Sequence, residues 1–344
     1  MNKKFMLEAV TLAQKAWGQT SPNPLVGAVV VKDGLIIGRG YHHRAGEAHA
    51  EVNALKDAGN AACGADIYVT LEPCSTTGRT PPCTEAIINA KIKTVYIGSV
   101  DPNPLHRGNA VKLLQAAGIH VTCDLEKDAC DQLNEAFFCW ITTGRPFVIL
   151  KMAMTLDGKI ATANGNSQWI TGPVARERVQ QLRQWADAIM VGGNTARVDH
   201  PSLTVRNIAD WTPQPRRIII SNNLTMAELD KSLPPGGDSE IAAPADAAAW
   251  KCYLKRLGDS GITALLIEGG GELAAEVIAA GVVDKVEFHI AMKILGGRDS
   301  RPVIGGGNPL ALAEAIQLKN IKTTRLGDDL AISGSLLRKP VVTD

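Results

Sequence analysis

Apolar and polar positions along the first half of the chain predict strands that alternate with helices. Two β-rich runs, 26–31 and 35–38, flank Lys32-Asp33-Gly34, and an Asp-Gly between such runs indicates a hairpin. An Ala-rich helix is expected from Ala48 to Ala58. Further strands are expected at Asp66–Leu71, Thr94–Val100 and Ile119–Cys123, and further helices at Thr84–Ala90, Ala110–Ala117 and Leu125–Trp140. This order is typical of an α/β layer fold with a largely parallel sheet.

The alternation starts again after residues 142–146, a Gly- and Pro-containing stretch that is expected to be a hinge. Strands are predicted at Phe147–Met154, Ala188–Val191, Arg216–Ser221, Ala264–Ile267 and Lys285–Ala291, and helices at Pro173–Ala186, Trp250–Leu257 and Glu272–Ala280. Residues 232–249 are rich in Pro, Gly and Ala, which predicts surface loops. We therefore expect two domains, 1–144 and 145–344, as a length of 344 residues also favours.

Composition and charge narrow the class of protein. With 45% hydrophobic and 21% charged residues and a formal net charge of +1, the chain is expected to be globular and lacks the strong field that binds nucleic acid. The N-terminus lacks the continuous apolar run of a signal peptide or membrane span, so a cytoplasmic protein without a membrane partner is expected. Seven cysteines, an odd number, fit reduced thiols better than a disulfide framework. The sequence leaves open whether the chain forms a homo-oligomer.

The strongest chemical signal is His49-Ala50-Glu51 followed by Cys74 and Cys83. One imidazole and two thiolates give zinc three protein ligands and leave the fourth tetrahedral position for water, whose pKa zinc lowers from ~15.7 toward ~7. Glu51 is suited to moving the protons of a deamination. Because residues two apart do not share a face within a helix, His49 and Glu51 are expected in a first turn.

Alternative interpretations remain at this point. The generic zinc-deaminase signature has two residues between its cysteines, whereas eight intervene here, so Cys74 and Cys83 could be unrelated core thiols. A deaminase of bases within RNA would need a basic groove, and a structural zinc protein would need a fourth protein ligand. The other cysteines are expected to be small buried hydrophobes, namely Cys63, Cys123, Cys130, Cys139 and Cys252.

Longer motifs occur over nearly the whole chain. The first half contains Ser21-Pro22-Asn23-Pro24, Gly40-Tyr41-His42, Thr70-Leu71-Glu72-Pro73-Cys74-Ser75, Gly78-Arg79-Thr80-Pro81-Pro82-Cys83 and Asp101-Pro102-Asn103-Pro104. The second half contains Lys151, Ser167-Gln168-Trp169-Ile170-Thr171, Asp199, Pro201-Ser202-Leu203-Thr204-Val205-Arg206 and Glu268-Gly269-Gly270. Together they resemble the bifunctional diaminohydroxyphosphoribosylaminopyrimidine deaminase / 5-amino-6-(5-phosphoribosylamino)uracil reductase family of riboflavin synthesis, in which the wide cysteine spacing is normal.

The resemblance implies a cytidine-deaminase-like three-layer domain followed by a dihydrofolate-reductase-like domain. It also implies two consecutive reactions on a small phosphoribosylaminopyrimidine: hydrolytic loss of an amino group with Zn2+, and reduction of the ribosyl group to a ribityl chain with NADPH. The alternative within this family is a deaminase that carries an inactive reductase-like domain.

The resemblance also implies roles for individual residues. The deaminase pocket would be formed by Asn23, His42, Arg79, Thr80, Asp101 and Asn103. The dinucleotide would contact Ala153, Trp169, Thr195, Asp199, Ser221, Gly270 and Gly271, the last two at a helix start that suits phosphate. The substrate of the reductase would contact Lys151, Ser167, Arg183, Leu203, Arg206 and Glu268, with both arginines suited to its phosphate. Without the family, Arg183 could be a solvated helix residue and Trp169 a core residue.

The chain departs from the family at four positions near these pockets. Thr76 stands where His is common, Ala110 where Gly is usual, Ser221 where Asp is frequent and Met292 where Pro is usual. The departures spare the zinc ligands, so they bear more on the reductase than on the deaminase.

Overall fold

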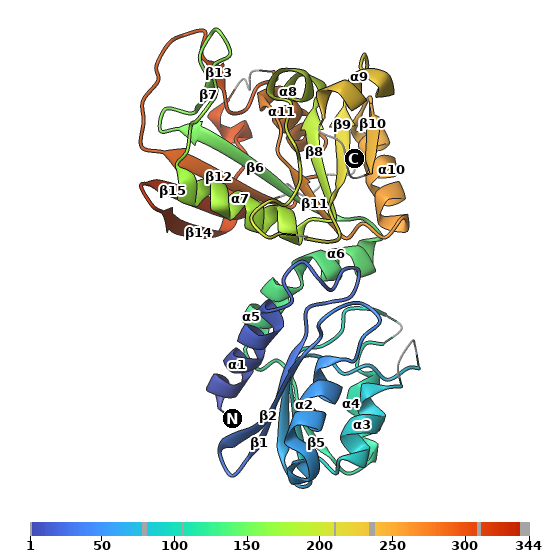
Figure 1. Cartoon of the computed structure of the whole chain (residues 1–344). Helices are drawn as coiled ribbons and strands as arrows, with labels where there is room; N and C mark the ends of the chain where they lie inside the picture. Colours follow the sequence, from blue (N-terminus) through green and yellow to red (C-terminus); the bar gives the residue numbers. More distant parts are fainter. Residues whose placement is uncertain are drawn as a thin grey trace. The chain divides into compact units, whose positions relative to one another are not determined.

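The computed structural model describes residues 2–77, 81–104, 106–209, 211–233, 238–307 and 311–337. The chain forms two compact units, Met1–Gly144 and Arg145–Asp344, each built on its own central sheet (Figure 1).

The sheet of the first unit has the strand order β2-β1-β3-β4-β5. Strand β1 runs antiparallel to β2 and β3, whereas β3, β4 and β5 are parallel. The predicted hairpin turns at Asp33 and Gly34, whose φ values of 50° and 77° are left-handed. The strands are β1 (Gly27–Lys32), β2 (Leu35–Tyr41), β3 (Asp66–Leu71), β4 (Thr94–Ser99) and β5 (His120–Thr122).

Helices cover both faces of this sheet, which makes three layers. One face packs Val29, Val31 and Tyr68 against α1 and α5, and the other packs alternate residues such as Val30 and Ile67 against α2, α3 and α4. Alternation of side chains along each strand therefore supplies both cores. The helices are α1 (Lys3–Gln14), α2 (Ala50–Ala58), α3 (Cys83–Asn89), α4 (Asn109–Ala116), α5 (Lys127–Leu133) and α6 (Glu135–Thr143), with a short 3-10 helix at Gly59–Ala62.

The prediction of one long helix over Leu125–Trp140 is wrong, because Asn134 separates α5 from α6. The Asn134 side chain accepts a hydrogen bond from the Leu25 N–H at 2.8 Å and donates one to the Leu25 carbonyl at 2.9 Å. This contact spans 109 residues, so a tertiary interaction overrides the local helical pattern.

Helix α2 lies directly on strand β2 because Gly40 has no side chain. A Cβ at Gly40 would stand 2.3 Å from both the Ala50 carbonyl oxygen and the Ala54 nitrogen. The close approach fixes the start of α2, which follows His49 directly.

The sheet of the second unit has the order β10-β9-β8-β11-β6-β12-β15-β14 (Figure 1). The first six strands of this order, from β10 through β9, β8, β11 and β6 to β12, are parallel to one another. Strand β15 is antiparallel to β12, and β14 is antiparallel to β15. The bounds are β6 (Phe147–Thr155), β8 (Ala188–Gly192), β9 (Arg216–Ile220), β10 (Ser239–Ala242), β11 (Ala264–Ile267), β12 (Lys285–Ala291), β14 (Leu318–Leu326) and β15 (Asp329–Leu336). A separate ribbon pairs β7 (Lys159–Ala161) with β13 (Arg301–Pro302).

Two expectations for this unit need correction. The stretch 232–249 is not only loop, because it contains β10 at an edge of the sheet and the first residues of α10. The C-terminal hairpin of β14 and β15 was not predicted, although Gly327 at its turn has the left-handed φ of 69° that such turns favour.

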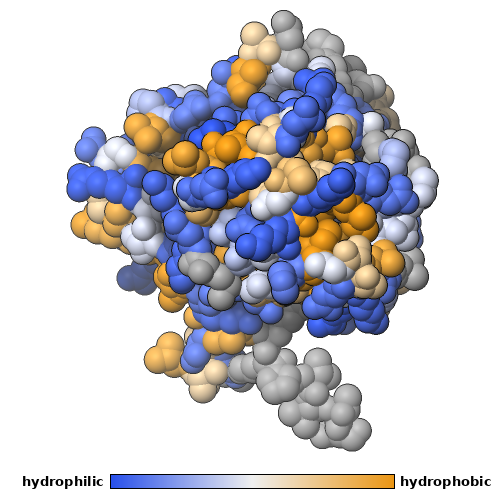
Figure 2. All heavy atoms as spheres, turned by 90° about the horizontal axis from the view of Figure 1, so that it is seen from below, coloured by the Kyte–Doolittle hydropathy of each residue, from blue (hydrophilic) through white to orange (hydrophobic). Residues whose placement is uncertain are grey.

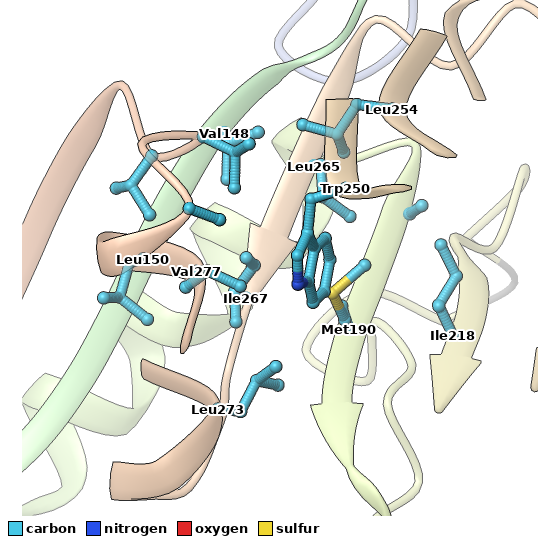
Figure 3. Close-up of a cluster of buried hydrophobic side chains, with 14 of the residues drawn as sticks. Val148, Leu150, Met190, Ile218, Trp250, Leu254, Leu265, Ile267, Leu273 and Val277 are labelled. Carbon is cyan, nitrogen blue, oxygen red and sulfur yellow. The ribbon is translucent and has the colours of Figure 1, made fainter. Parts of the chain in front are cut away.

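Buried side chains on each face of the second sheet pack against helices. Figure 3 shows one face, where Met190 lies beside Trp250 and where Val148 and Leu150 belong to the same cluster of buried side chains. The opposite face carries Ile149 and Ile189 against Leu182. The helices are α7 (Pro173–Trp185), α8 (Gly193–Asp199), α9 (Met226–Ser232), α10 (Ala247–Asp259) and α11 (Gly271–Ala279), with a 3-10 helix at Leu312–Glu314.

The surface mixes hydrophilic and apolar residues, as one face shows in Figure 2. Among the described residues, no helix has the length and apolar character required to cross a bilayer. All seven cysteines are free thiols, but the prediction that the five outside the zinc motif are buried is wrong for Cys63 and Cys252, which are exposed. It is confirmed for Cys130, and Cys123 and Cys139 are partly exposed.

Candidate active sites

Three elements of the first unit bring His49, Cys74 and Cys83 together. His49 is the N-cap of α2, Cys74 follows β3, and Cys83 is the first residue of α3. His49 Nδ1 lies 3.2 Å from Cys83 Sγ and 3.5 Å from Cys74 Sγ, and the three donor atoms all lie within 4.8 Å of one another. Ligands around a tetrahedral zinc are separated by roughly 3.5 Å, so this donor set fits the ion.

Hydrogen bonds within the cluster shift the pKa values of the two thiols in opposite directions. Hydrogen bonds from Cys83 and His49 lower the pKa of Cys74 to about 4, although burial opposes this shift. The hydrogen bond to Cys74 and burial raise the pKa of Cys83. The Cys83 backbone N–H also donates to Cys74 Sγ at 3.2 Å, which orients that ligand.

Glu51 lies in the first turn of α2, as the sequence predicts, and its side chain turns inward. The residue is only 3% exposed. Burial raises its pKa to about 7, and the neighbouring Cys74 thiolate adds to the shift. A carboxyl group that titrates near neutral pH can both accept and return a proton.

Asn23 and His42 form a hydrogen-bonded pair of polar side chains beside His49. His42 Nδ1 lies 3.2 Å from the Ala48 carbonyl, which can only accept, so this nitrogen carries the proton. His42 Nε2 then accepts from the Asn23 side-chain amide at 3.1 Å. Burial lowers the pKa of His42, which favours this neutral form, and its ring lies edge-on to His49 with centroids 5.3 Å apart.

Asp101 and Asn103 lie in the loop between β4 and α4. The Asn103 N–H donates to Asp101 Oδ1 at 2.8 Å, and burial raises the pKa of Asp101. Arg79 and Thr80 lie outside the described residues. Two of the positions at which the chain departs from the family lie in this unit. Ala110 is fully buried at the start of α4, and Thr76 is exposed.

Sequence reasoning missed Glu72 as a functional candidate. Its buried carboxylate accepts hydrogen bonds from the backbone N–H groups of Asp101, Gly108 and Ala110. The signal in the sequence was a carboxylate directly after a buried strand, which needs donors from some other part of the chain.

In the second unit, three charged residues lie side by side across the sheet. Lys151 in β6 is opposite Glu287 of β12, and Glu268 follows Ile267, whose partner is Leu150. Burial lowers the pKa of Lys151, while Glu268 and Glu287 act in the opposite direction.

Helix α7 supplies an arginine to each of these carboxylates. Arg183 donates to both Glu268 oxygens at 2.7 and 2.9 Å, and Arg178 donates to both Glu287 oxygens at 2.9 and 3.0 Å. Sequence reasoning missed Arg178, Glu287 and the fully buried His289, which lies 2.9 Å from Glu287. Arg183 is buried, so the alternative of a solvated helix residue is wrong.

The other proposed contacts of the reductase substrate are either more exposed than Arg183 or have their side chains in the core. Ser167 is half-buried and Arg206 is exposed, with its backbone N–H bonded to the Gln180 side chain. The Leu203 side chain is buried in the core that includes Leu182, so its backbone, with a left-handed φ of 49°, is the part available to a ligand.

Most of the proposed dinucleotide contacts lie where parallel strands end. A Cβ on Gly193, the first residue of α8, would stand 2.7 Å from Ser221 Oγ, and one on Gly270 would stand 3.4 Å from Thr195 Oγ1. These contacts join the ends of β8, β9 and β11, the usual place for ligands in open α/β sheets. Gly271, the first residue of α11, accepts a hydrogen bond from the Gly305 N–H.

Trp169, Ala153 and Asp199 complete this set. Trp169 is 65% exposed, so the alternative of a core residue is wrong, and the Arg176 guanidinium lies 4.7 Å from the centroid of its ring. Ala153 is in β6 opposite His289, and Asp199 is exposed at the end of α8. Met292, the remaining departure, is also exposed.

Comparisons with known proteins cover both units. Residues 1–99 match the family model described as the cytidine and deoxycytidylate deaminase zinc-binding region, and residues 146–332 match the RibD C-terminal domain. The riboflavin biosynthesis protein RibD of Aquifex aeolicus is 41% identical over 96% of this chain and 98% of that protein, and the Escherichia coli protein is 38% identical over 95% and 97%.

Solved structures agree with these matches over the whole length. Acinetobacter baumannii RibD has a TM-score of 0.87 at 34% identity, covering 98% of this chain and 99% of that chain. The Thermotoga maritima diaminohydroxyphosphoribosylaminopyrimidine deaminase / 5-amino-6-(5-phosphoribosylamino)uracil reductase has a TM-score of 0.84 at 33% identity, covering 97% and 98%. The predicted fold class is thereby confirmed.

Proposed function

The chain belongs to the RibD family of riboflavin-biosynthesis enzymes, and from this premise we propose that residues 1–144 are its deaminase and residues 145–344 its reductase. As a member of this family it is a bifunctional enzyme with a small-molecule substrate, a zinc-binding deaminase domain and an NADPH-dependent reductase domain. The observation that carries the residue assignments is the cluster of His49, Cys74 and Cys83 beside the buried carboxyl group of Glu51.

The proposed substrate of the first reaction is 2,5-diamino-6-(5-phosphoribosylamino)pyrimidin-4-one. The second reaction reduces the ribosyl group of the deaminated product and gives 5-amino-6-(5-phosphoribitylamino)uracil. A net charge of +1 supports this small substrate over a nucleic acid. We place the enzyme in the cytoplasm, in agreement with its free thiols.

In the deaminase, His49, Cys74 and Cys83 would hold zinc. Zinc in such a site acts as a Lewis acid that makes water nucleophilic at neutral pH. Glu51 accepts the proton that the attacking water loses, and it delivers protons to the ring nitrogen and to the departing amine, which leaves as ammonia. Asn23 and His42, oriented by their mutual hydrogen bond, bind the polar edge of the base.

Within the described residues the metal-binding cluster has three members, and this supports a catalytic role over a structural one. A structural zinc site is closed by a fourth protein ligand, whereas a catalytic site keeps one position open. The buried Glu51, two residues after His49, would supply such a site with a proton acceptor.

In the reductase, the row of Glu268, Lys151 and Glu287 would receive the sugar. NADPH supplies the hydride when it is bound at the strand ends near Thr195 and Gly270. Within the described part of the chain, no hydrogen bond or ion pair joins Lys151 Nζ to another residue, although Lys151 is partly buried between Glu268 and Glu287. It is therefore suited to bind a sugar oxygen and to give it the proton that must accompany the hydride.

One activity assay tests both assignments. It contains the purified protein, zinc, the diaminopyrimidine phosphate and NADPH. We expect release of ammonia and oxidation of NADPH in equal amounts. Glu51→Gln should release no ammonia but still oxidise NADPH when it is given the deaminated intermediate, and Lys151→Met should show the reverse. Ammonia release without NADPH oxidation in the unmodified protein would reject the reductase assignment.

A further inference from the structure

Glu72 accepts three backbone hydrogen bonds from residues after β4, two in the loop before α4 and one in the first turn of α4. The Asp101 and Gly108 N–H groups donate to Glu72 Oε2 at 3.1 and 3.0 Å, and the Ala110 N–H donates to Oε1 at 3.1 Å. The residue is 6% exposed. Its own N–H donates to the Ser99 carbonyl at 2.8 Å, which fixes its backbone against the end of β4.

These three backbone donors satisfy both oxygens of the buried Glu72 carboxyl group. Within the described residues, no lysine, arginine or histidine forms an ion pair with Glu72. A buried carboxylate without a cation depends on its hydrogen-bond donors, so the loop cannot move away without exposing the charge or leaving it unsatisfied. The departure from glycine at Ala110 leaves this contact intact, because the backbone N–H is the donor.

The same loop carries two residues that the proposed function places in the deaminase pocket. Asp101 donates its own N–H to Glu72 and accepts from the Asn103 N–H, so the conformation at both positions follows from the carboxylate. Glu72 is also two residues before the metal ligand Cys74. Residues 72–74 therefore contain both a metal ligand and the carboxylate that binds Asp101, Gly108 and Ala110.

We propose that Glu72 is a positioning residue of the deaminase: its carboxylate holds Asp101 and Gly108, at the two ends of the stretch before α4, and Ala110 in the first turn of α4, so that Asp101 and Asn103 face the substrate. This inference rests on the proposed function, because it takes those two residues as substrate contacts. Glu72 itself touches neither the reacting atoms nor the metal ligands. Its contribution is to substrate binding, and it acts through the loop.

Glu72→Gln in the full-length zinc enzyme tests this role. The amide replaces one oxygen with a donor, so at least one backbone N–H loses its acceptor and the loop loosens. We expect KM for the diaminopyrimidine phosphate to rise about tenfold or more, since a hydrogen bond to a charged group is lost. The turnover number should stay within about twofold and the zinc content should not change, because Glu51 and the ligands are untouched.

Two further measurements exclude a general effect on folding. Hydrogen exchange of the Asp101, Gly108 and Ala110 amides should speed up in Glu72→Gln. Asp187→Asn is the matched control, because Asp187 is also a carboxylate that accepts backbone N–H bonds, from Thr263 and Ala264 in the second unit. It should leave the KM of deamination unchanged. If Glu72→Gln does not fold, Glu72→Asp, which keeps the charge but shortens its reach, should show the same rise in KM.

Each other outcome overturns the inference. Loss of zinc with an unchanged KM would mean that Glu72 acts on Cys74 alone, and unchanged kinetics would mean that the loop does not need it. Asp101→Asn, which keeps the acceptor for the Asn103 N–H, separates this failure from failure of the pocket assignment. If it raises KM while Glu72→Gln does not, only the role of Glu72 is wrong; if neither does, Asp101 is not a substrate contact.

Discussion

Gly40→Ala should inactivate the deaminase and leave the reductase active, because it changes the contact at which α2 packs on β2 in the first unit. The new methyl group would stand 2.3 Å from the Ala50 carbonyl oxygen and the Ala54 nitrogen, whereas ordinary contacts begin at 3.4 Å. The helix must therefore retreat by about 1 Å, and His49, its N-cap, moves with it. Metal ligands tolerate errors of only about 0.2 Å, so the three-donor cluster opens.

We expect Gly40→Ala to lose zinc and to release ammonia about 100-fold more slowly, since a 1 Å error in a catalytic group costs about that much. Overpacking should also lower the free energy of unfolding of the first unit by about 1–3 kcal/mol. Metal analysis, ammonia release and calorimetry measure these effects, and NADPH oxidation with the deaminated intermediate is the internal control. Gly307→Ala, where a Cβ meets no atom of the described residues within 4 Å, is the matched substitution. A Gly40→Ala enzyme with full zinc and unaltered ammonia release would refute the reasoning.

Three other predictions follow from the sites. Glu51→Gln should keep its zinc and slow ammonia release at least about 100-fold, because the amide cannot carry the proton; metal analysis with a turnover assay checks both, and retained turnover would remove Glu51 from the mechanism. Arg183→Met should destabilise the second unit by up to about 3–5 kcal/mol, because the mostly buried Glu268 loses the arginine that donates to both its oxygens and keeps Lys151 as a nearby cation; denaturant unfolding measures this, and a loss below about 1 kcal/mol would show that the pair contributes little. Burial would raise the pKa of Glu287, but His289 and Arg178 lower it to about 2, so its stabilising contribution is complete above the unfolded pKa of about 4.3 and is lost as pH falls toward 2. The melting temperature of Glu287→Gln should accordingly fall less steeply than that of the wild type between pH 4.5 and 2, and parallel curves would contradict the assignment.

The zinc cluster could be predicted from the sequence because its chemistry is encoded in short segments. His49 and Glu51 are two residues apart at the start of a helix, so their spacing alone indicates the chemistry. The eight residues between Cys74 and Cys83 match the generic signature only in part, so the second cysteine was assigned with the help of the family resemblance. Strands such as β3 and β4 were predicted nearly to the residue, since continuous apolar runs bounded by turns specify buried strands.

Features that depend on distant partners could not be predicted. The break at Asn134 requires a bond to Leu25, and the role of Glu72 requires donors that come from 29 to 38 residues further along the chain. The hairpin of β14 and β15 was missed because β14 is an edge strand whose residues are mostly exposed, so it lacks the apolar pattern that identifies buried strands.

The hydrogen bonds between Asn134 and Leu25 also determine how short a fragment of the chain can be if it is to work as a deaminase by itself. The match to the zinc-binding family model ends at residue 99, yet Leu25, two residues after Asn23, has both its backbone groups bonded to the Asn134 side chain. A fragment cut at residue 99 would leave those groups to solvent and release the segment that orients Asn23. A stand-alone catalytic module therefore has to retain the chain past Asn134, well beyond the part that carries the recognisable zinc chemistry.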